Sequence, residues 1–422
     1  MTNSPPTFQF GRRRRVPVKR ARPKGETVVK PEVIVIGAGI AGLTAAACLL
    51  KNGYRVRVYE QSDHLSELGA GIQISANAGR VLHHLGLEEQ LRQASSAPLT
   101  WLTRVFDSGE VINEISLGNH HEDTHGVPYY QLHRRDLHRM LVALVRSFDP
   151  GAITLSARAV GFTESDHAVT VEFANGKNAS ASIVIGADGI KSALRGRIVT
   201  KESITYTGNT AWRCVIAAEA LPQHFMSHMT TTWVGPGRHM IMYWLDGGKM
   251  LNMVAPVERH EWAEESWTLH CPWEELKADF EGWHADVQSV IDACDRDACY
   301  RWALNSRAPV DNWRTDRVIL IGDAAHPTLP FMAQGAAMAI EDAAVLARAL
   351  ESDEEPAHCL ELFQQNRLSR TAKIVVSSQE MSHINHLATA EELRRAYDRR
   401  REITRDRDSW LYSYDPLRVA LK

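Results

Sequence analysis

Cysteine is scarce in this chain, and no two cysteines stand at a redox or metal-binding spacing. The 422 residues contain six, scattered from Cys48 to Cys359, with no Cys-x-x-Cys motif. Disulfide-stapled secreted domains carry denser and more regular cysteines than this. The sequence therefore predicts small buried thiols in a reducing, cytoplasmic setting.

Long apolar runs are also lacking. Although 44% of the residues are hydrophobic, no window approaches the roughly 18–20 apolar residues that a bilayer-spanning helix needs. We therefore expect no membrane association. A hydrophobic content of this size over this length can bury a sizeable core, in two interleaved lobes or domains.

Acidic residues are almost absent from the first thirty positions, where nine Lys and Arg stand against Glu26 alone. A basic segment so poor in apolar residues is predicted to be a disordered arm, residues 1–30. A nucleic-acid tail and a targeting peptide are the specific alternatives. We favour a non-catalytic extension and expect no nucleic-acid partner.

What the chain does contain is a glycine-rich motif at residues 37–42, where Gly-Ala-Gly-Ile-Ala-Gly follows a run of Val and Ile. A segment of helical periodicity and a second strand ending in Glu60 complete a βαβ dinucleotide-binding unit. In such a unit Gly37 allows the tight turn, Gly39 admits a pyrophosphate, and Gly42 permits close helix packing. Glu60 would accept hydrogen bonds from a ribose and disfavours a 2′-phosphate, which leaves FAD or NAD.

Two more predicted strands end in turns of a similar kind. Gly-Ala-Asp-Gly stands at 186–189, and Gly-Asp at 322–323 follows Val318–Ile321. Beyond the second, Gln-Gly at 334–335 opens a long Ala-rich helix, whose unpaired N–H groups and dipole would hold an anionic or electron-rich group. Three such turns converging on one ligand indicate something longer than a mononucleotide.

These three motifs together resemble the single-component FAD-dependent aromatic hydroxylases, a group similar in fold to para-hydroxybenzoate hydroxylase. Within it the chain most resembles the branch of salicylate hydroxylase, 3-hydroxybenzoate 6-hydroxylase and 6-hydroxynicotinate 3-monooxygenase. The resemblance runs from about Glu32 to the C-terminus. It implies an α/β (α+β) fold in which a Rossmann-type FAD-binding domain is interleaved with a β-sheet substrate domain and followed by C-terminal helices.

The expected domain boundaries follow the motifs. After the basic arm come a first FAD-binding part (31–202, in which 70–105 contributes to the substrate side), a substrate-binding sheet (203–300), the return of the FAD-binding domain (301–350) and a helical region (351–422).

The resemblance also implies the cofactor-binding residues. The ADP half of FAD would be held by Gly37, Gly39, Gly42 and Glu60, and the rest by Arg134, Asp188, Asp323 and the N–H groups near Gly335 and Ala336. Arg134 would contact the middle of the cofactor, and Asp188 would serve both FAD and the nicotinamide. Asp323 would bind the ribityl or pyrophosphate region.

The implied activity is hydroxylation of a small aromatic or N-heteroaromatic hydroxy acid, with NAD(P)H and O₂, through a flavin C4a-hydroperoxide. Only one Gly-x-Gly-x-x-Gly is present, and in this group NAD(P)H docks transiently at the flavin. A 6-hydroxynicotinate-type hydroxylase, another FAD-dependent oxidoreductase such as a halogenase or alkene reductase, and a non-enzymatic FAD-fold escort protein are the alternatives. A homodimer is a further expectation.

Substrate recognition is expected from the strands of the middle region. His239, Ile241 and Tyr243 alternate on one predicted strand and so share a face. A base with a pKa near 7 would help to ionise the substrate's hydroxyl. In related members the histidine at this position is proposed as that base, so we assign His239 and Tyr243 to catalysis, although a packed histidine fits the pattern too. Ile241, Pro330 and Phe331 are expected to wall the substrate pocket.

A cluster of possible metal ligands lies at 120–125, with three histidines, a glutamate and an aspartate. Their spacing does not specify a tetrahedral site. We interpret them as a solvated loop and expect no metal.

Overall fold

A computed structural model describes residues 30–65, 71–199, 203–225, 228–259 and 271–422, with the side chains of 400–409 left aside. Apart from Lys30, the predicted basic arm lies outside the described residues. Residues 31–422 form one compact unit. In the described part of the chain no helix is long and apolar enough to cross a membrane.

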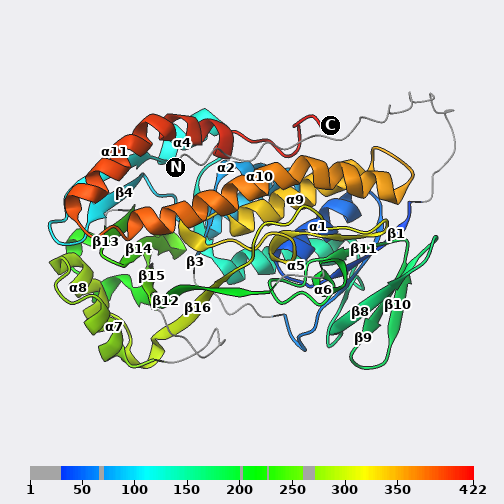
Figure 1. The fold of residues 1–422 in the computed structure, drawn as a ribbon, viewed down its shortest axis with the longest axis horizontal. Helices are drawn as coiled ribbons and strands as arrows, with labels where there is room; N and C mark the ends of the chain where they lie inside the picture. The colour runs from blue at the N-terminus through cyan, green and yellow to red at the C-terminus, as the bar shows by residue number, and fades with distance from the viewer. Residues whose placement is uncertain (1–29, 66–70, 200–202, 226–227, 260–270) are drawn as a thin grey trace, which may run out of the picture. The chain divides into compact units, whose positions relative to one another are not determined.

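A five-stranded parallel sheet carries the dinucleotide-type motif (Figure 1). Its strand order is β17-β11-β1-β2-β7, with bounds β1 Glu32–Ile36, β2 Arg55–Tyr59, β7 Ile153–Thr154, β11 Ile183–Gly186 and β17 Val318–Leu320. Helix α1 (Ile40–Lys51) follows β1 directly. The β-branched residues of β1, β11 and β17 are buried because helices and loops cover both faces of the sheet. The predicted βαβ unit is confirmed.

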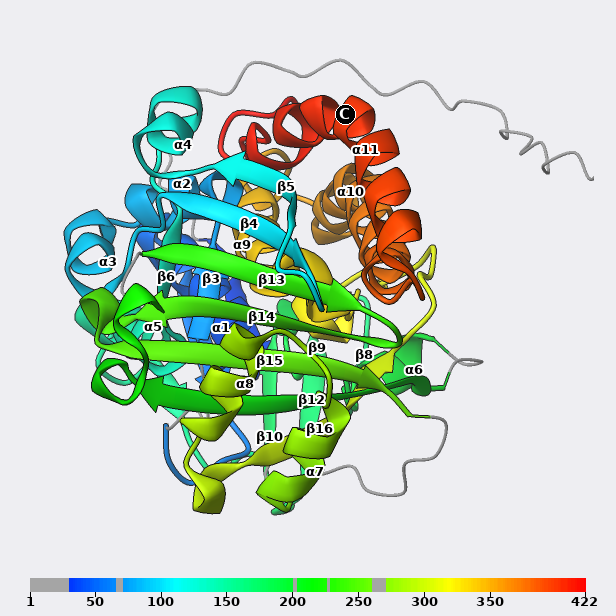
Figure 2. The ribbon, with the colours of Figure 1, turned by 90° about the vertical axis from the view of Figure 1, so that its left-hand side faces the viewer.

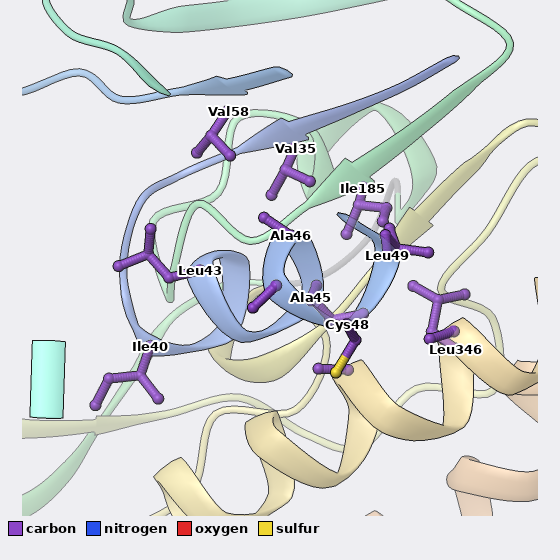
Figure 3. Close-up of a cluster of buried hydrophobic side chains, with 14 of the residues drawn as sticks. Val35, Ile40, Leu43, Ala45, Ala46, Cys48, Leu49, Val58, Ile185 and Leu346 are labelled. Carbon is purple, nitrogen blue, oxygen red and sulfur yellow. The ribbon is translucent and has the colours of Figure 1, made fainter. Parts of the chain in front are cut away.

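Helix α1 packs closely between this sheet and helix α9 (Gly335–Leu350), as Figure 3 shows. Its small residues Ala45 and Ala46 are fully buried, and beside them lie Val35 and Ile185 of the sheet and Leu346 of α9. Small side chains let two elements approach, and every methylene buried there contributes about 0.8 kcal/mol. This core fixes the starts of both helices at one edge of the sheet.

A seven-stranded sheet forms the second layer (Figure 2). Its order is β16-β12-β15-β14-β13-β4-β5, antiparallel except between β13 and β4, with bounds β4 Thr100–Val105, β5 Val111–Ser116, β12 Thr205–Ala217, β13 Met229–Gly235, β14 Arg238–Leu245, β15 Met250–Glu258 and β16 Tyr300–Ser306. One face packs Trp212 and Met253 against helices α7 (Trp273–Asp279) and α8 (Ala285–Asp292). The other face turns toward the parallel sheet's helices.

The remaining strands are short. They are β3 Gly71–Ile74 and β6 Tyr130–His133, which pair with each other, and the three-stranded sheet β8 Ala159–Glu164, β9 Val169–Phe173 and β10 Asn178–Ala181. The other helices are α2 Ala76–His84, α3 Glu88–Ala94, α4 Gly118–His125, α5 Arg134–Phe148, α6 Arg195–Ile198, α10 Pro356–Asn385 and α11 Ala390–Arg407. The expected fold class, an FAD-binding α/β fold with a second sheet and C-terminal helices, is confirmed.

Residues 75–94 are divided between α2 and α3, because Gly86 takes a positive φ of 87° and ends the first helix. One local expectation was wrong. The expected solvated loop at 120–125 is helix α4, in which His121 and His125 are buried against Tyr412 of the C-terminal tail. Tertiary contact with a segment nearly 300 residues away decides that conformation. In the described residues no cluster of three metal-binding side chains occurs there or elsewhere.

Candidate active site

One cavity of about 430 Å³ lies between the two sheets. The carboxyl ends of three parallel strands open onto it, through Gly39, Ala187 and Asp323, which is where open α/β sheets bind ligands. Eight of the predicted site residues line this cavity: Gly39, Arg134, Ile241, Tyr243, Asp323, Pro330, Gly335 and Ala336. The sequence motifs, far apart along the chain, therefore converge on one concave site.

The glycine-rich turn has two glycines required by the protein and one that is not. Gly37 has a φ of 103°, and a Cβ there would lie 2.4 Å from the Ala187 carbonyl oxygen. A Cβ on Gly42 would lie 2.0 Å from the Gly37 oxygen. At Gly39 a Cβ would meet nothing within 4 Å, and the residue faces the cavity at the start of α1. The free space at Gly39 is what a closely bound ligand needs.

Ala38, at the centre of that turn, is held from both sides. Its N–H donates to Glu60 Oε2 at 2.8 Å, and its carbonyl oxygen lies 2.8 Å from Nε2 of His138 on α5. Glu60 also accepts from the Ser62 N–H through Oε1 at 2.9 Å. Glu60 thus shapes the turn as well as ending β2, while His138 was not singled out from the sequence. The signal for it was present in the His-Arg-x-Asp-Leu-His pattern, of which it is the last member.

Asp188 caps the turn after β11. Its Oδ2 accepts from the Ala193 N–H at 2.8 Å, while its buried Oδ1 has no hydrogen-bond partner among the described residues. Burial raises the pKa of this carboxyl, and hydrogen bonds from Ser192 and the turn act against it. Its neighbours Ala187 and Gly189 line the cavity. An orphaned buried acceptor costs free energy, so a donor supplied by a ligand would stabilise this turn.

Asp323 and Arg134 both line the cavity. Asp323 follows β17 and is open to the cavity, whereas Arg134 begins α5. The surrounding protein raises the pKa of Asp323 by desolvation, and the charges of Arg134 and His326 lower it in part. A carboxylate and a guanidinium lining the same cavity suit a ligand with hydroxyl and phosphate groups.

Helix α9 points its N-terminus into the cavity, since Gly335, Ala336 and Ala339 line it. The preceding Ala333 has a φ of 53°, an uncommon conformation for alanine. Gln334 is fully buried, and its Oε1 accepts from Asn77 Nδ2 at 3.0 Å. The start of the helix is therefore fixed by buried polar contacts, with its free N–H groups toward the cavity.

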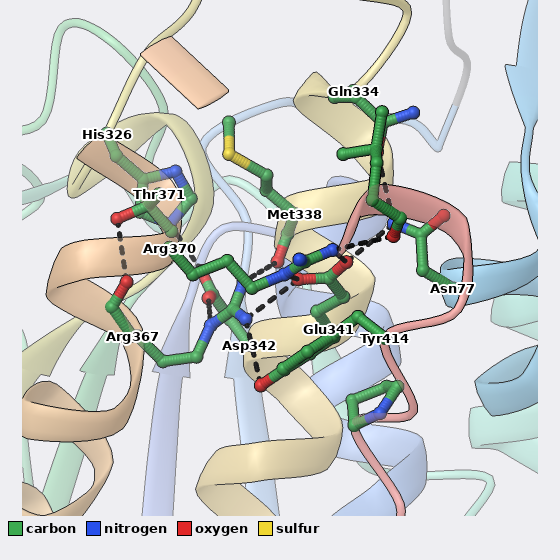
Figure 4. A network of polar contacts seen from close by, with 12 residues as sticks. Asn77, His326, Gln334, Met338, Glu341, Asp342, Arg367, Arg370, Thr371 and Tyr414 are labelled. Carbon is green, nitrogen blue, oxygen red and sulfur yellow. Dashed lines mark hydrogen bonds and ion pairs between the residues drawn. The ribbon is translucent and has the colours of Figure 1, made fainter. Parts of the chain in front are cut away.

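A buried ionic network behind α9 holds this arrangement, as Figure 4 shows. Asp342 accepts from Arg367 Nε at 2.7 Å, lies 2.6 Å from His326 Nε2, and accepts from the Gly322 N–H at 2.9 Å. Because Gly322 precedes Asp323, this hydrogen bond to Asp342 fixes the position of the Gly-Asp turn relative to α9. The adjacent Glu341 is buried and paired with Arg367 and Arg370. The sequence placed two acids in this helix, but nothing in the pattern showed that they were buried.

The opposite wall of the cavity belongs to the large sheet and carries aromatic and aliphatic side chains. Tyr243 and Ile241 of β14, Val254 of β15, and Trp302 of β16 line it. Arg213 of β12 joins them, its guanidinium carbon 5.6 Å from the Trp302 ring centroid. Arg213 was missed in the sequence. The available signal was a lone arginine between two residues, Trp212 and Cys214, that turn to the opposite, buried face.

Arg213 is half-buried, and no carboxylate pairs with it in the described part of the chain. Burial lowers its pKa to about 10, partly offset by Tyr243 and reinforced by Arg134. It therefore stays charged at neutral pH, at a desolvation cost that an anionic ligand would reduce. The pKa of Tyr243 is raised by burial, against the effect of Arg213, so its hydroxyl remains protonated.

His239 shares the strand face of Ile241 and Tyr243, yet it is not among the described residues that line the cavity. It is buried, and its ring makes an edge contact with Phe331 at 5.0 Å between centroids. Phe331 is also absent from the lining, although Pro330 and Ala333 on its loop belong to it. His239 Nδ1 lies 2.8 Å from Nε2 of His386, just after α10. The predicted base thus stands behind the cavity wall.

The residues present fit FAD. The cavity joins two helix N-termini, a glycine with free space where a pyrophosphate would approach, an arginine and an open carboxylate. Asp188, whose buried Oδ1 is unpartnered in the described part of the chain, stands in the sequence between the lining residues Ala187 and Gly189. These features recognise phosphates, a polyol and an electron-rich ring along one path. Gly39, Arg134, Asp323 and Gly335 would hold the group.

Known proteins agree with this geometry. A family model described as "FAD binding domain" matches residues 30–378. The chain is 37% identical over 394 residues to a 3-amino-4-hydroxybenzoate 2-monooxygenase of Streptomyces platensis, covering 93% of this chain and 98% of the relative. It is 36% identical over 360 residues to a 6-hydroxynicotinate 3-monooxygenase of Bordetella bronchiseptica, covering 84% and 91%.

A solved structure supports the same conclusion. HpxO of Klebsiella pneumoniae, complexed with FAD and uric acid, has 29% sequence identity and a TM-score of 0.78, covering 89% of this chain and 94% of that one. The chain belongs to the FAD-binding family, among its FAD-dependent aromatic monooxygenases.

Proposed function

We propose that this monooxygenase hydroxylates a small aromatic or N-heteroaromatic acid that already carries a ring hydroxyl, with NAD(P)H as reductant. The observation that carries the proposal is the cavity itself, which joins two helix N-termini to a wall of Arg213, Tyr243 and Trp302. The substrates named for the two relatives, 3-amino-4-hydroxybenzoate and 6-hydroxynicotinate, both combine a ring hydroxyl with a carboxylate.

The substrate groups match the wall residues. Arg213 would pair with the carboxylate, because a guanidinium binds two carboxylate oxygens at once. Trp302 and Ile241 would stack on the ring, and the Tyr243 hydroxyl would donate to a substrate oxygen. Charge-assisted hydrogen bonds of this kind contribute about 1.5–3 kcal/mol each.

The cofactor side follows the sequence assignments. Gly37, Gly39, Gly42 and Glu60 would shape the ADP site, with Arg134, Asp188 and Asp323 along the middle of the cofactor. The N–H groups of Gly335 and Ala336 would stabilise negative charge on the ring system, because they lie at the positive end of α9. Bound FAD, reduced by NAD(P)H, supplies the activation of O₂. One oxygen atom enters the substrate ring and the other leaves as water.

The experiment is a substrate screen with the purified protein. We expect a yellow protein whose NADH oxidation is accelerated by 3-hydroxybenzoate, 4-hydroxybenzoate, salicylate or 6-hydroxynicotinate, with a hydroxylated product for at least one. Uric acid belongs in the screen because the HpxO structure contains it. A protein that holds FAD but hydroxylates none of these acids contradicts the proposal.

Two further assignments go with it. We infer a homodimer, to be measured by light scattering, and a cytoplasmic location, in line with six buried free thiols.

A further inference from the structure

Three ionisable side chains form a continuous hydrogen-bonded series from behind the cavity wall to the protein surface. His239 Nδ1 lies 2.8 Å from His386 Nε2, and His386 Nδ1 lies 2.8 Å from Glu258 Oε1. Both histidine rings are buried, whereas the side chain of Glu258, at the end of β15, is 49% exposed. The three residues come from β14, α10's end and β15, which other contacts already hold together, including a 3.1 Å bond from the Gly237 N–H to the His386 carbonyl.

The direction of each hydrogen bond in this series follows from the carboxylate of Glu258 at its exposed end. A carboxylate can only accept, so His386 Nδ1 carries the hydrogen that Glu258 accepts. In a neutral His386 the Nε2 atom then has the lone pair, so His239 must donate from Nδ1. The remaining nitrogen of His239, Nε2, is thereby left with its lone pair. This is the orientation that a general base requires.

We propose that Glu258 and His386 act through His239, holding it as an Nε2 base and relaying to solvent the proton that it takes from the substrate's hydroxyl. In the balanced step, the substrate O–H proton binds His239 Nε2 while His239 releases its Nδ1 proton to His386 Nε2. His386 releases its own Nδ1 proton to Glu258, which passes it to water. The proposal rests on the proposed function, since it requires a substrate with an ionisable hydroxyl.

The inner end of the relay is His239, which lies behind the cavity wall and in contact with Phe331. Ile241 lines the cavity two residues along the strand from His239, and the Phe331 ring packs edge-on against His239. Phe331 is half-buried and its loop neighbour Pro330 lines the cavity. The proposed relay requires the Phe331 ring to turn aside, so that His239 can reach a bound hydroxyl.

The surroundings of the two histidines disfavour their protonated forms, so neither histidine retains the proton. Burial lowers the pKa of His239, and the neighbouring His386 lowers it further. Burial also lowers the pKa of His386, where Glu258 acts in the raising direction and Arg238 and His383 in the lowering direction. Both rings are therefore neutral at neutral pH. A proton taken up by His239 therefore has to move on toward solvent. In the described residues, Glu258 is the only exposed acceptor that is hydrogen-bonded to the two histidines.

The test compares Glu258→Gln with the matched surface variant Glu110→Gln. Glutamine keeps the size of Glu258 and can still accept from His386, but its amide does not take up a proton. Glu110 is similarly exposed, at 44%, and pairs with Arg394 away from the relay. FAD content, the rate of flavin reduction, product formed per NADH, and proton release after substrate mixing are measured from pH 6 to 9.

For Glu258→Gln we expect proton release and product yield at neutral pH to fall at least about tenfold, with peroxide in place of product. Flavin reduction should be unchanged. Added imidazole or formate buffer should restore the release, which a merely structural role would not allow. His386→Gln should show the same loss, and Glu110→Gln should match the wild type.

A Glu258→Gln protein with the wild-type release rate and pH profile overturns the relay, as does a loss that no buffer relieves. A wild-type protein that holds FAD but hydroxylates no acid overturns the proposed function, and the relay with it.

Discussion

The hydroxyl oxygen of Tyr243 lies 2.7 Å from the place that a Cβ atom on Gly71 would occupy, and its ring carbon Cε2 lies 2.4 Å from it. Both residues line the cavity, and the Gly71 N–H donates to Asn252 Oδ1 at 3.0 Å. The glycine is thus required by the approach of a side chain, since contacts under 3.0 Å force a shift. The position of the tyrosine in the site depends on the missing methyl group.

Gly71→Ala should therefore displace the Tyr243 ring. We expect a higher KM for the aromatic acid and more peroxide per NADH, with unchanged FAD content, because the cofactor residues are elsewhere. The effect should be smaller in a Tyr243→Leu background, so a double-mutant cycle on kcat/KM should give a coupling of about 0.5–3 kcal/mol. Strictly additive effects would show that Gly71 acts independently of Tyr243.

Gly39 and Gly42 should separate ligand binding from folding. Gly39→Ala places its methyl group in open space, so we expect the apoprotein's free energy of unfolding to change by less than about 1 kcal/mol. FAD should bind about 10–100-fold more weakly, because loss of charge-assisted contacts costs about 1.5–3 kcal/mol. Flavin fluorescence titration and urea unfolding measure the two effects.

Gly42→Ala is the control with the opposite pattern. Its methyl group would lie 2.0 Å from a backbone oxygen, so α1 must move from β1 and the apoprotein itself should lose stability. If Gly39→Ala bound FAD as tightly as the wild type, the pyrophosphate assignment would be wrong.

Asp342 should make a large contribution to the free energy of unfolding and to the loss of that free energy at acidic pH. Burial acts to raise its pKa, but the charges of His326 and Arg367 outweigh this and hold the pKa below its usual range. Its contribution is therefore complete above the unfolded pKa of about 3.9 and is lost as the pH falls toward the lower folded value. Asp342→Asn should lower the free energy of unfolding at pH 7 by about 3–5 kcal/mol, since it leaves Arg367 poorly compensated.

Urea unfolding at pH 7, 5, 4 and 3.5 measures this. The wild type should lose stability below about pH 4, and Asp342→Asn should lose less over that interval. Glu361→Gln, which removes a surface partner of Arg314, should change stability by less than about 1 kcal/mol. Equal effects of the two substitutions would contradict a special role for the buried acid.

The parallel sheet could be predicted because its signals are local. A run of Val and Ile before a glycine turn predicts both a buried strand and the place where it ends. The observed ends of β1 and β17 therefore lie within one residue of the predicted ones. The convergence of Gly39, Asp323 and Gly335 also followed, since carboxyl ends of parallel strands share an edge. Helix α4 could not be predicted, because its buried His121 is covered by Tyr412 from the opposite end of the chain.

The substrate wall could be predicted only in part. Strand alternation put His239, Ile241 and Tyr243 on one face, which the structure shows, but alternation does not say which of them Phe331 covers. His386 is 147 residues from His239, and its meeting with Glu258 depends on where a 30-residue helix ends. Pairings of that range are set by tertiary packing, so the relay was not visible in the sequence.

Arg213 offers a direct measurement of what the cavity recognises. It is charged, half-buried, stacked near Trp302 and without a carboxylate partner in the described residues. Arg213→Gln should raise the KM for the aromatic acid about 10–100-fold, the equivalent of about 1.5–3 kcal/mol. Flavin content and reduction without the acid should not change.

A lysine substitution at Arg213 and a methyl ester of the substrate test whether Arg213 binds the carboxylate. Arg213→Lys keeps the charge but not the two-pronged geometry, so it should recover only part of the affinity. The wild type should prefer the acid to its methyl ester, and Arg213→Gln should lose that preference because the ester lacks the charge that Arg213 binds. If the glutamine variant kept the preference for the acid, the carboxylate would bind elsewhere in the cavity, and Arg134 would be the next residue to test.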